Sequence, residues 1–145
     1  MKLLIEQSTE INEVEIKITC NYMDDRLKRL IEQIKLYSFS LVGQLDGVSV
    51  PIALENIYYF DTVDNNVFIY TINKVYNSDK KLYELEELLN NSPFTRISKS
   101  CIVNTSYVAS VKAHFSGRIE ITLENNEKLI VSKHYIQDFK RKFIF

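Results

Sequence analysis

The feature that most constrains the fold of this chain is a series of short segments that alternate polar and apolar residues between turns. The clearest, residues 118–123, reads Arg-Ile-Glu-Ile-Thr-Leu and is flanked by Ser-Gly at 116–117 and Asn-Asn at 125–126. A period of two buries one face of a β-strand. Asp-Gly at 46–47 separates two further apolar segments and favours a hairpin, because Gly accepts the positive φ that a tight turn demands. Most of the chain is therefore predicted to form a β-meander.

Two short helices are expected among the strands. Ser78 or Asp79 can cap the first, which Pro93 stops, and the second runs from His134 to Phe145 with cationic residues near its end. The helix faces carry Leu82, Leu85, Leu88 and Leu89, and then Ile136, Phe139 and Phe143. Strands are expected at residues 39–45, 48–52, 57–60, 67–70, 94–97, 107–114, 118–123 and 128–132. The predicted fold class is mostly β, of the α+β type.

The first 45 residues are predicted to form a strand, a helix and a strand. Residues 13–20 alternate polar and apolar side chains, and residues 2–6 could pair with them. Asp24 or Asp25 can cap a helix that continues to Tyr37. One face of this helix carries Leu27, Leu30, Ile31 and Ile34, which a small sheet formed by the flanking strands could cover. We therefore predict an extension at 1–44, a candidate dimerisation or regulatory element, and a second unit at 45–145.

Charge divides the 145-residue chain unevenly. The net charge is −1, but residues 94–145 hold nine basic and four acidic residues and residues 1–93 hold nine basic and fifteen acidic ones. Such asymmetry suggests an anionic partner for the basic half. The sequence has no apolar run of membrane-spanning length, no apparent export signal and only two cysteines, Cys20 and Cys101. A soluble protein of the reducing cytoplasm, without membrane insertion, is expected.

Catalysis has no positive support in the sequence. The three glycines are scattered, so they form no phosphate-binding motif, and His114 and His134 lack the spacing of a metal pair. A Cys-His nucleophile pair involving Cys101 stays open, although chance co-occurrence explains it better. We predict no enzyme activity, no cofactor and no metal. Cys101 adjoins an apolar run, which indicates a structural role, with a redox sensor as the alternative.

Three polar connections are candidate anion-binding loops. Ser98-Lys99-Ser100 separates two apolar stretches and offers hydroxyl and ammonium donors for phosphate oxygens or base acceptors. Ser132-Lys133-His134 repeats this chemistry where a strand meets a helix, and backbone N–H groups at a helix start add to an anion site. Asn65 and Asn66 can form a turn or read adenine. The alternative interpretations are a solvated loop at 98–100 and a helix N-cap at Ser132.

The order of these motifs resembles the LytTR family of bacterial DNA-binding domains. The resemblance covers about residues 45–145, and its strongest part is the stretch from Phe94 to Asn104. The other matching elements are Ile57-Tyr58-Tyr59-Phe60-Asp61, Asn65-x-Val67, the leucine helix at 82–89, Gly117 in a turn and Val131-Ser132-Lys133-x-Tyr135.

The resemblance implies antiparallel β-sheets with short helices and loops that enter the DNA major groove at paired promoter repeats. Many members carry His-Arg-Ser where this chain has 98–100, and Ser-Arg where it has 132–133. Lysine lacks the bidentate fork of arginine, so the preferred base can differ. The base-contacting loops map onto Asn65, Asn66, Ser98, Lys99 and Lys133. For a DNA-binding function, the candidate backbone neighbours are Arg96, Lys112, Arg118 and His134. The complete set of candidate DNA-binding residues is Asn65, Asn66, Arg96, Ser98, Lys99, Ser100, Ser132, Lys133 and His134.

Two classes of function follow from these observations. The first is a stand-alone, sequence-specific transcription regulator without a receiver domain, which binds double-stranded DNA as a homodimer joined by its N-terminal extension. Joined readers occupy paired repeats more tightly, because the second binding event becomes effectively intramolecular. The second is a protein-interaction module, in which the acidic N-terminal half binds a partner and the basic half is only a solvated face.

Overall fold

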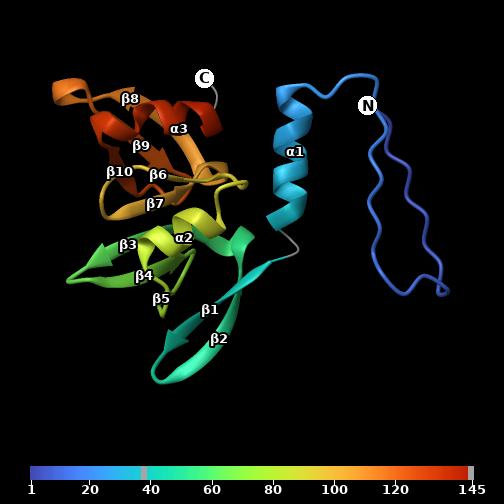
Figure 1. Ribbon diagram of the computed structural model, residues 1–145, viewed down its shortest axis with the longest axis horizontal. Coiled ribbons are helices and arrows are strands. Elements are labelled where there is room, and N and C mark those ends of the chain that lie inside the picture. Colours follow the sequence, from blue (N-terminus) through green and yellow to red (C-terminus); the bar gives the residue numbers. More distant parts are fainter. Residues whose placement is uncertain (37–38, 144–145) are drawn as a thin grey trace.

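The computed structural model describes residues 1–36 and 39–143 and consists mainly of antiparallel strands arranged in two sheets (Figure 1). Among these residues the larger sheet has the strand order β2-β1-β5-β4-β3-β7-β6 and the smaller one the order β10-β9-β8. The strands of the larger sheet are β1 (Ser40–Leu45), β2 (Val48–Ala53), β3 (Ile57–Val63), β4 (Asn66–Thr71), β5 (Val75–Ser78), β6 (Phe94–Arg96) and β7 (Cys101–Asn104). Those of the smaller sheet are β8 (Val108–Ala113), β9 (Ile119–Leu123) and β10 (Lys128–Val131).

Three α-helices and four single turns of 3-10 helix accompany the strands in the described part of the chain. The α-helices are α1 (Asp25–Leu36), α2 (Leu82–Leu88) and α3 (Ile136–Phe143). The 3-10 turns are η1 (Leu54–Asn56), η2 (Thr105–Tyr107), η3 (Phe115–Gly117) and η4 (Lys133–Tyr135). None of these helices is long and apolar enough to cross a membrane. The predicted mostly β fold class is confirmed.

Local turn chemistry fixes the register of two hairpins. Asp46 and Gly47 join β1 to β2 with φ values of 53° and 77°, and Asp64 and Asn65 join β3 to β4 with φ values of 51° and 65°. Positive φ at both central residues is the signature of the type I′ turn, whose twist matches that of the flanking strands. Both hairpins were expected from the Asp-Gly and Asp-Asn-Asn sequences.

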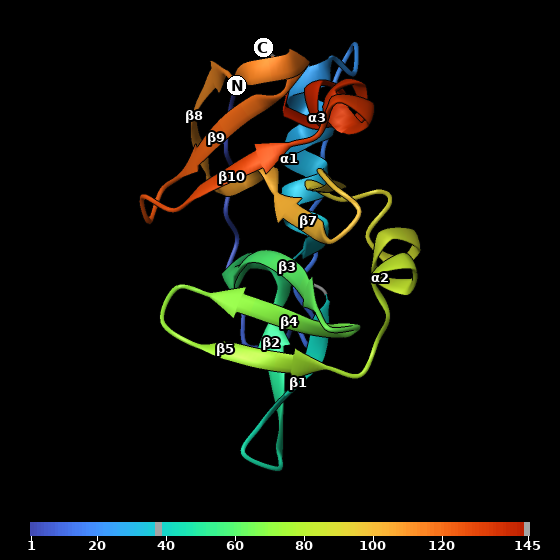
Figure 2. The ribbon, with the colours of Figure 1, turned by 90° about the vertical axis from the view of Figure 1, so that its left-hand side faces the viewer.

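Strands β3 and β7 separate two hydrophobic cores. Ile102 of β7 belongs to the core under α2, whereas Cys101 and Val103 on either side of it belong to the core that contains α3 and the smaller sheet. Strands buried on both faces read as continuous apolar runs, which explains the composition of this segment. Figure 2 shows β7 between β3 and the smaller sheet. Phe60 and Phe139, both 0% exposed, lie at the centres of the two cores.

The expected strands at residues 2–6 and 13–20 do not form. Residues 1–24 are all described and contain no strand, although a backbone bond of 3.3 Å from Ile11 N to Ser8 O closes a turn. The alternating pattern gives these residues one apolar face, but the two segments have no further strand to pair with. An isolated two-stranded hairpin is only marginally stable in water. The N-terminal sheet expected to cover α1 is consequently absent from these residues.

The helices agree with the sequence pattern in one cap and differ from it at two points. Asp24 caps α1, because its carboxylate accepts the Leu27 amide at 2.8 Å. The expected cap at Ser78 or Asp79 is wrong: Ser78 ends β5, paired with Val67, and α2 starts at Leu82. Leu88 is 55% exposed and does not share the buried face of its helix. The expected helical positions 37, 144 and 145 lie outside the described residues.

Candidate nucleic-acid interface

Three polar connections that are far apart in sequence meet at one end of the larger sheet. The Thr62 amide at the end of β3 donates to the Ser100 carbonyl at 2.8 Å, which joins the β3–β4 turn to the loop at 97–100. The Ser132 amide after β10 donates to the Ile97 carbonyl, also at 2.8 Å. These backbone bonds place the predicted loops around 65, 99 and 133 on one surface, which we call the loop surface.

The loop at 97–100 is held from inside by Arg96. Its Nε donates to the Ser98 carbonyl at 3.0 Å and its second terminal nitrogen to the Lys99 carbonyl at 2.5 Å. The remaining terminal nitrogen forms an ion pair with Glu86 of α2 at 2.7 Å. A guanidinium presents its donors in a planar fork, so one side chain can satisfy three acceptors in different directions. Arg96 thus acts as a brace of the loop, a role that its place in the sequence pattern did not indicate.

The two serines of this loop bond to each other and leave Lys99 outermost. The Ser98 hydroxyl accepts the Ser100 amide at 3.2 Å, and the two hydroxyl oxygens lie 3.3 Å apart. The Lys99 side chain is exposed and makes no hydrogen bond or ion pair with any described residue. The loop therefore presents one ammonium on a short, internally bonded scaffold.

A second exposed lysine extends from η4. Lys133 and His134 are both exposed, and the Tyr135 amide donates to the Ser132 carbonyl at 2.9 Å. Ser132 occupies the N-cap position, as the alternative interpretation of this segment has it, but its side chain makes no cap hydrogen bond. The turn is closed by main-chain atoms instead, which leaves the hydroxyl available.

The η3 turn supports Lys133 from the smaller sheet. Gly117 has a φ of +75°, and a Cβ there would lie 3.5 Å from Cδ of Lys133. The positive φ favours glycine at this position, whereas the 3.5 Å separation is an ordinary van der Waals contact. Phe115 of the same turn is 81% exposed. An aromatic ring this exposed beside the loop surface was missed by the sequence reasoning, and its position in a turn gave no signal.

Asn65 and Asn66 complete the set at the β3–β4 turn. Both are exposed, and the Asn66 side-chain amide donates to the Asp64 carbonyl at 3.3 Å. Asn66 thus stabilises the turn that orients Asn65. Among the basic neighbours, Lys112 pairs with Glu120 at 3.7 Å, which leaves Lys99 and Lys133 as the more available cations.

The loop surface is an exposed face and not a cavity. The two best-formed pockets lie elsewhere, one beside α1 and one beside β2 and the β4–β5 turn. No group of three or more His, Cys, Asp or Glu side chains among the described residues could hold a metal ion. Exposed ammonium, hydroxyl and amide groups on short loops can donate to phosphate oxygens and to base edges.

Comparison with known proteins identifies the class. The family model of the LytTr DNA-binding domain matches residues 47–144, and the chain belongs to this family. It is not a family of enzymes.

Individual relatives agree with this membership. An uncharacterized HTH-type transcriptional regulator of Staphylococcus aureus strain MSSA476 is 29% identical over 144 residues, which cover 98% of this chain and 97% of that protein. The sensory transduction protein LytT of Bacillus subtilis is 28% identical over 96 residues, or 66% of this chain and 40% of LytT. A LytTr DNA-binding domain of a putative methyl-accepting/DNA response regulator from Bacillus cereus superposes with a TM-score of 0.68, at 20% identity, over 73% of this chain and 97% of that domain.

Proposed function

We propose that this DNA-binding regulator recognises specific promoter repeats through its loop surface, with Lys99 and Lys133 in the major groove. The observation that carries this proposal is the convergence of their two loops through the backbone bond between Ser132 and Ile97. Two ammonium groups on adjacent short loops can reach base acceptors while their scaffolds stay fixed. Lysine donates as a point charge, so we expect guanine O6 or N7 as acceptors without bidentate geometry.

The other candidate residues have distinct proposed roles. Asn65 contacts a base edge or sugar from the β3–β4 turn, and Asn66 supports that turn. Ser98, Ser100, Ser132 and His134 donate to phosphates beside the groove. Arg96 acts through the loop that it braces, and its ion pair with Glu86 leaves only part of its charge for DNA.

The described helices do not provide a helix-turn-helix reader. Strands separate α1 from α2 and α2 from α3 among the described residues, so no two α-helices are consecutive there. Loop-mediated recognition is the reading mode that fits this topology.

We further propose that regulation takes place in the cytoplasm, with residues 1–44 as a pairing element and 45–145 as the DNA reader. Paired repeats favour joined readers, because the second contact is effectively intramolecular. The competing candidate is the protein-interaction module, for which the acidic N-terminal half is the only specific support.

Selection of bound fragments from a genomic DNA pool tests the proposal. We expect enrichment of a small set of fragments that share a repeated motif, with binding that weakens as salt screens the phosphates. Recovery of fragments without a common motif would contradict sequence-specific reading. Failure to retain any DNA at low salt would favour the interaction module.

A further inference from the structure

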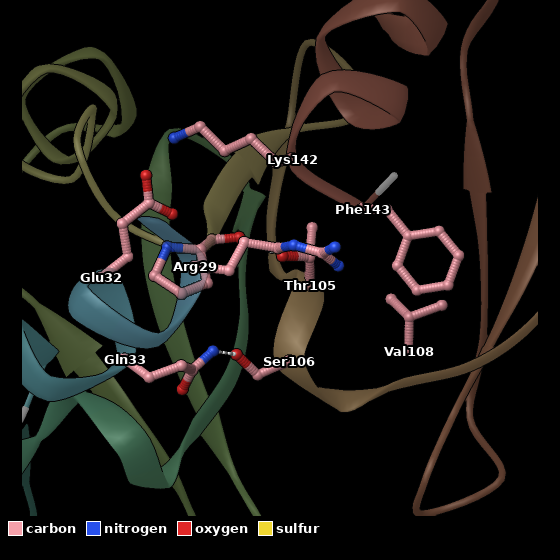
Figure 3. A pocket seen from close by; sticks show the side chains of 9 residues that line it. Arg29, Glu32, Gln33, Thr105, Ser106, Val108, Lys142 and Phe143 are labelled. Carbon is pink, nitrogen blue, oxygen red and sulfur yellow. Dashed lines mark hydrogen bonds between the residues drawn. The ribbon is translucent and has the colours of Figure 1, made fainter. Parts of the chain in front are cut away.

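Helix α1 faces the rest of the protein with its polar side. Arg29, Glu32 and Gln33 line a pocket of about 220 Å³ whose other wall includes Thr105, Ser106, Lys142 and Phe143 (Figure 3). The Gln33 side-chain amide donates to the Ser106 hydroxyl. At the end of the helix, Leu36 is 2% exposed and enters the core under α2. The helix is therefore held by its last turn and by a hydrogen bond beside a pocket.

The apolar side of α1 points the other way. An apolar stripe runs along this side and consists of Leu27, Leu30, Ile31 and Ile34. The face that meets the rest of the protein carries residues 29, 32, 33 and 36. At 100° per residue, the centres of the stripe and of this face are about 160° apart around the helix. Leu30 is 41% exposed. An amphipathic helix normally buries its apolar stripe against its own core. Here Leu27, Ile31 and Ile34 are half-buried and Leu30 is exposed, so the α1 stripe is only partly covered and can accept a further apolar surface.

The N-terminal arm, residues 1–24, also exposes apolar side chains. It lies on the far side of α1 from the sheets (Figure 1) and forms no strand. Ten of the twenty exposed large hydrophobic residues in the described chain belong to it. These are Met1, Leu3, Leu4, Ile5, Ile11, Val14, Ile16, Ile18, Tyr22 and Met23. Contiguous exposed apolar groups of this extent mark interaction sites.

The accessible surface is larger than that of a compact monomer of the same mass. The chain exposes 10545 Å², whereas a compact monomer of its mass is expected to expose about 7,700 Å². The excess, about 2,800 Å², is more than the roughly 1,000 Å² that each partner of a stable dimer buries. The exposed arm and α1 therefore offer enough surface for an interface of that size.

Charge complements the apolar pattern. The arm carries Glu6, Glu10, Glu13, Glu15 and Asp24 against Lys2 and Lys17, a net charge of −3. Helix α1 carries Arg26, Lys28, Arg29 and Lys35 against Asp25 and Glu32, a net charge of +2. An acidic arm and a basic helix attract each other at an interface.

We propose that these surfaces bind a second copy of this chain. In the dimer the two α1 stripes pack against each other about a twofold axis, and the arm of each copy lies along the basic flank of the partner's α1. A twofold interface uses the same patch on both subunits, and two apolar stripes of equal length are self-complementary. The chain's own arm leaves Leu30 exposed, so the stripe needs a cover from outside. This interface does not depend on DNA binding.

The full-length chain at tens of micromolar tests the interface in sedimentation equilibrium. We expect a dimer, twice 17.0 kDa, and a dissociation constant raised at least tenfold by Leu30→Glu, because its carboxylate would be desolvated against the partner. The matched control is Leu88→Glu on α2, where the leucine is 55% exposed and outside the interface. It should remain dimeric.

A second variant and a cross-link cover the case in which Leu30→Glu fails to fold. Ile16→Lys changes only the arm, and we expect it to weaken the dimer with an unchanged circular dichroism spectrum. Cys20 in the arm is exposed while Cys101 is buried, so a bifunctional maleimide should join two copies through Cys20 and not in Cys20→Ser.

A monomeric wild type would overturn the interface, as would a dimer that survives both Leu30→Glu and Ile16→Lys. Binding of a different polypeptide to a monomeric chain through this face would also overturn it. A monomer that still selects a DNA motif would refute the interface and the pairing role proposed for residues 1–44, and would leave the proposed DNA recognition by the loop surface standing.

Discussion

Arg96 is the single residue on which the shape of the loop at 97–100 depends most. Its guanidinium contacts two carbonyls of the loop and the Glu86 carboxylate. A lysine keeps the charge but cannot serve these three acceptors from one planar group.

We therefore predict that Arg96→Lys lowers affinity for the selected DNA about five- to tenfold while the protein stays folded. We expect the variant to dissociate faster from DNA. The salt dependence of binding should change little, because the net charge is preserved. Binding to surface-immobilised DNA measures the affinity and the dissociation rate, and a thermal melt measures folding. Unchanged affinity would show that the brace is dispensable for the loop.

Cys101 illustrates how burial controls the chemistry of a residue. It is 7% exposed in the core that contains α3. Burial raises the pKa of the Cys101 thiol well above its ordinary value of 9.0, and the nearby Asp61 carboxylate acts in the same direction. The thiolate required for redox sensing is therefore disfavoured, which supports the structural role.

This shift predicts a pH dependence of stability. The folded state favours the protonated thiol, so its contribution is complete below pH 9 and is lost as pH rises through the window above the unfolded value. Chemical denaturation at intervals from about pH 8 to about pH 10 should show a declining free energy of unfolding, with a shallower decline in Cys101→Ala. Equal declines in both proteins would contradict the assignment.

At the scale of elements, one side chain of α3 adds a polar contact to the apolar packing of that helix on the larger sheet. Lys142 Nζ donates to the carbonyls of Asn90, Ser92 and Phe94 at 2.6, 2.8 and 2.8 Å. Burial lowers the pKa of Lys142, but three acceptors require the three N–H donors of the ammonium. The sequence indicates only that a cation near a helix C-terminus is favourable. The structure shows in addition that Lys142 binds three carbonyl groups outside its own helix.

We predict that Lys142→Met lowers the free energy of unfolding by about 1–2 kcal/mol, since it leaves three carbonyls without this donor and the side chain is only half-buried. Lys80→Met, at an exposed position after β5, is the control and should change stability by less than about 0.5 kcal/mol. Urea denaturation measures both. Equal stability of the two variants would mean that water replaces the ammonium at no cost.

The elements that could be predicted from the sequence are those whose signal is local. The turns at 46–47 and 64–65 carry their own conformational preference, and the strict alternation at 118–123 corresponds to β9. Strand β5 was missed because Val75–Ser78 is short and half polar, and because its partner Gly43 in β1 is distant in sequence. Residues 13–20 show the opposite error: a strand was predicted there and none forms. An alternating pattern does not supply the neighbouring strand that a sheet requires.

The candidate site shows the same limit. Lys99 and Lys133 were identifiable as exposed cations in polar connections, and the family pattern located them. Their proximity depends on long-range backbone bonds such as that from Ser132 to Ile97, which no local pattern encodes. The bracing role of Arg96 likewise depends on Glu86, a residue of α2 with no motif of its own.

At the scale of the whole molecule, the proposed DNA-binding surface and the proposed dimer interface lie on different parts of the chain. The loop surface lies at one end of the larger sheet, whereas α1 lies beside the sheets and the N-terminal arm lies beyond α1 (Figure 1). Such a separation would allow two copies to pair without covering the residues that contact DNA. The proposed DNA recognition by the loop surface and the proposed dimer can therefore fail independently.

Equilibrium binding of the selected DNA fragment at several salt concentrations tests the central claim most directly, in the wild type, Lys99→Ala, Lys133→Ala, the double variant and Lys74→Ala. Lys74 is an exposed lysine in the β4–β5 turn, at the opposite end of the sheet from the β3–β4 turn. We predict that each loop variant loses about 1–3 kcal/mol of specific binding and relaxes preference at its base position, whereas Lys74→Ala binds as the wild type does. If a lysine also neutralises a phosphate, its loss reduces the salt slope by about one. Wild-type affinity and base preference in the folded double variant would contradict the account.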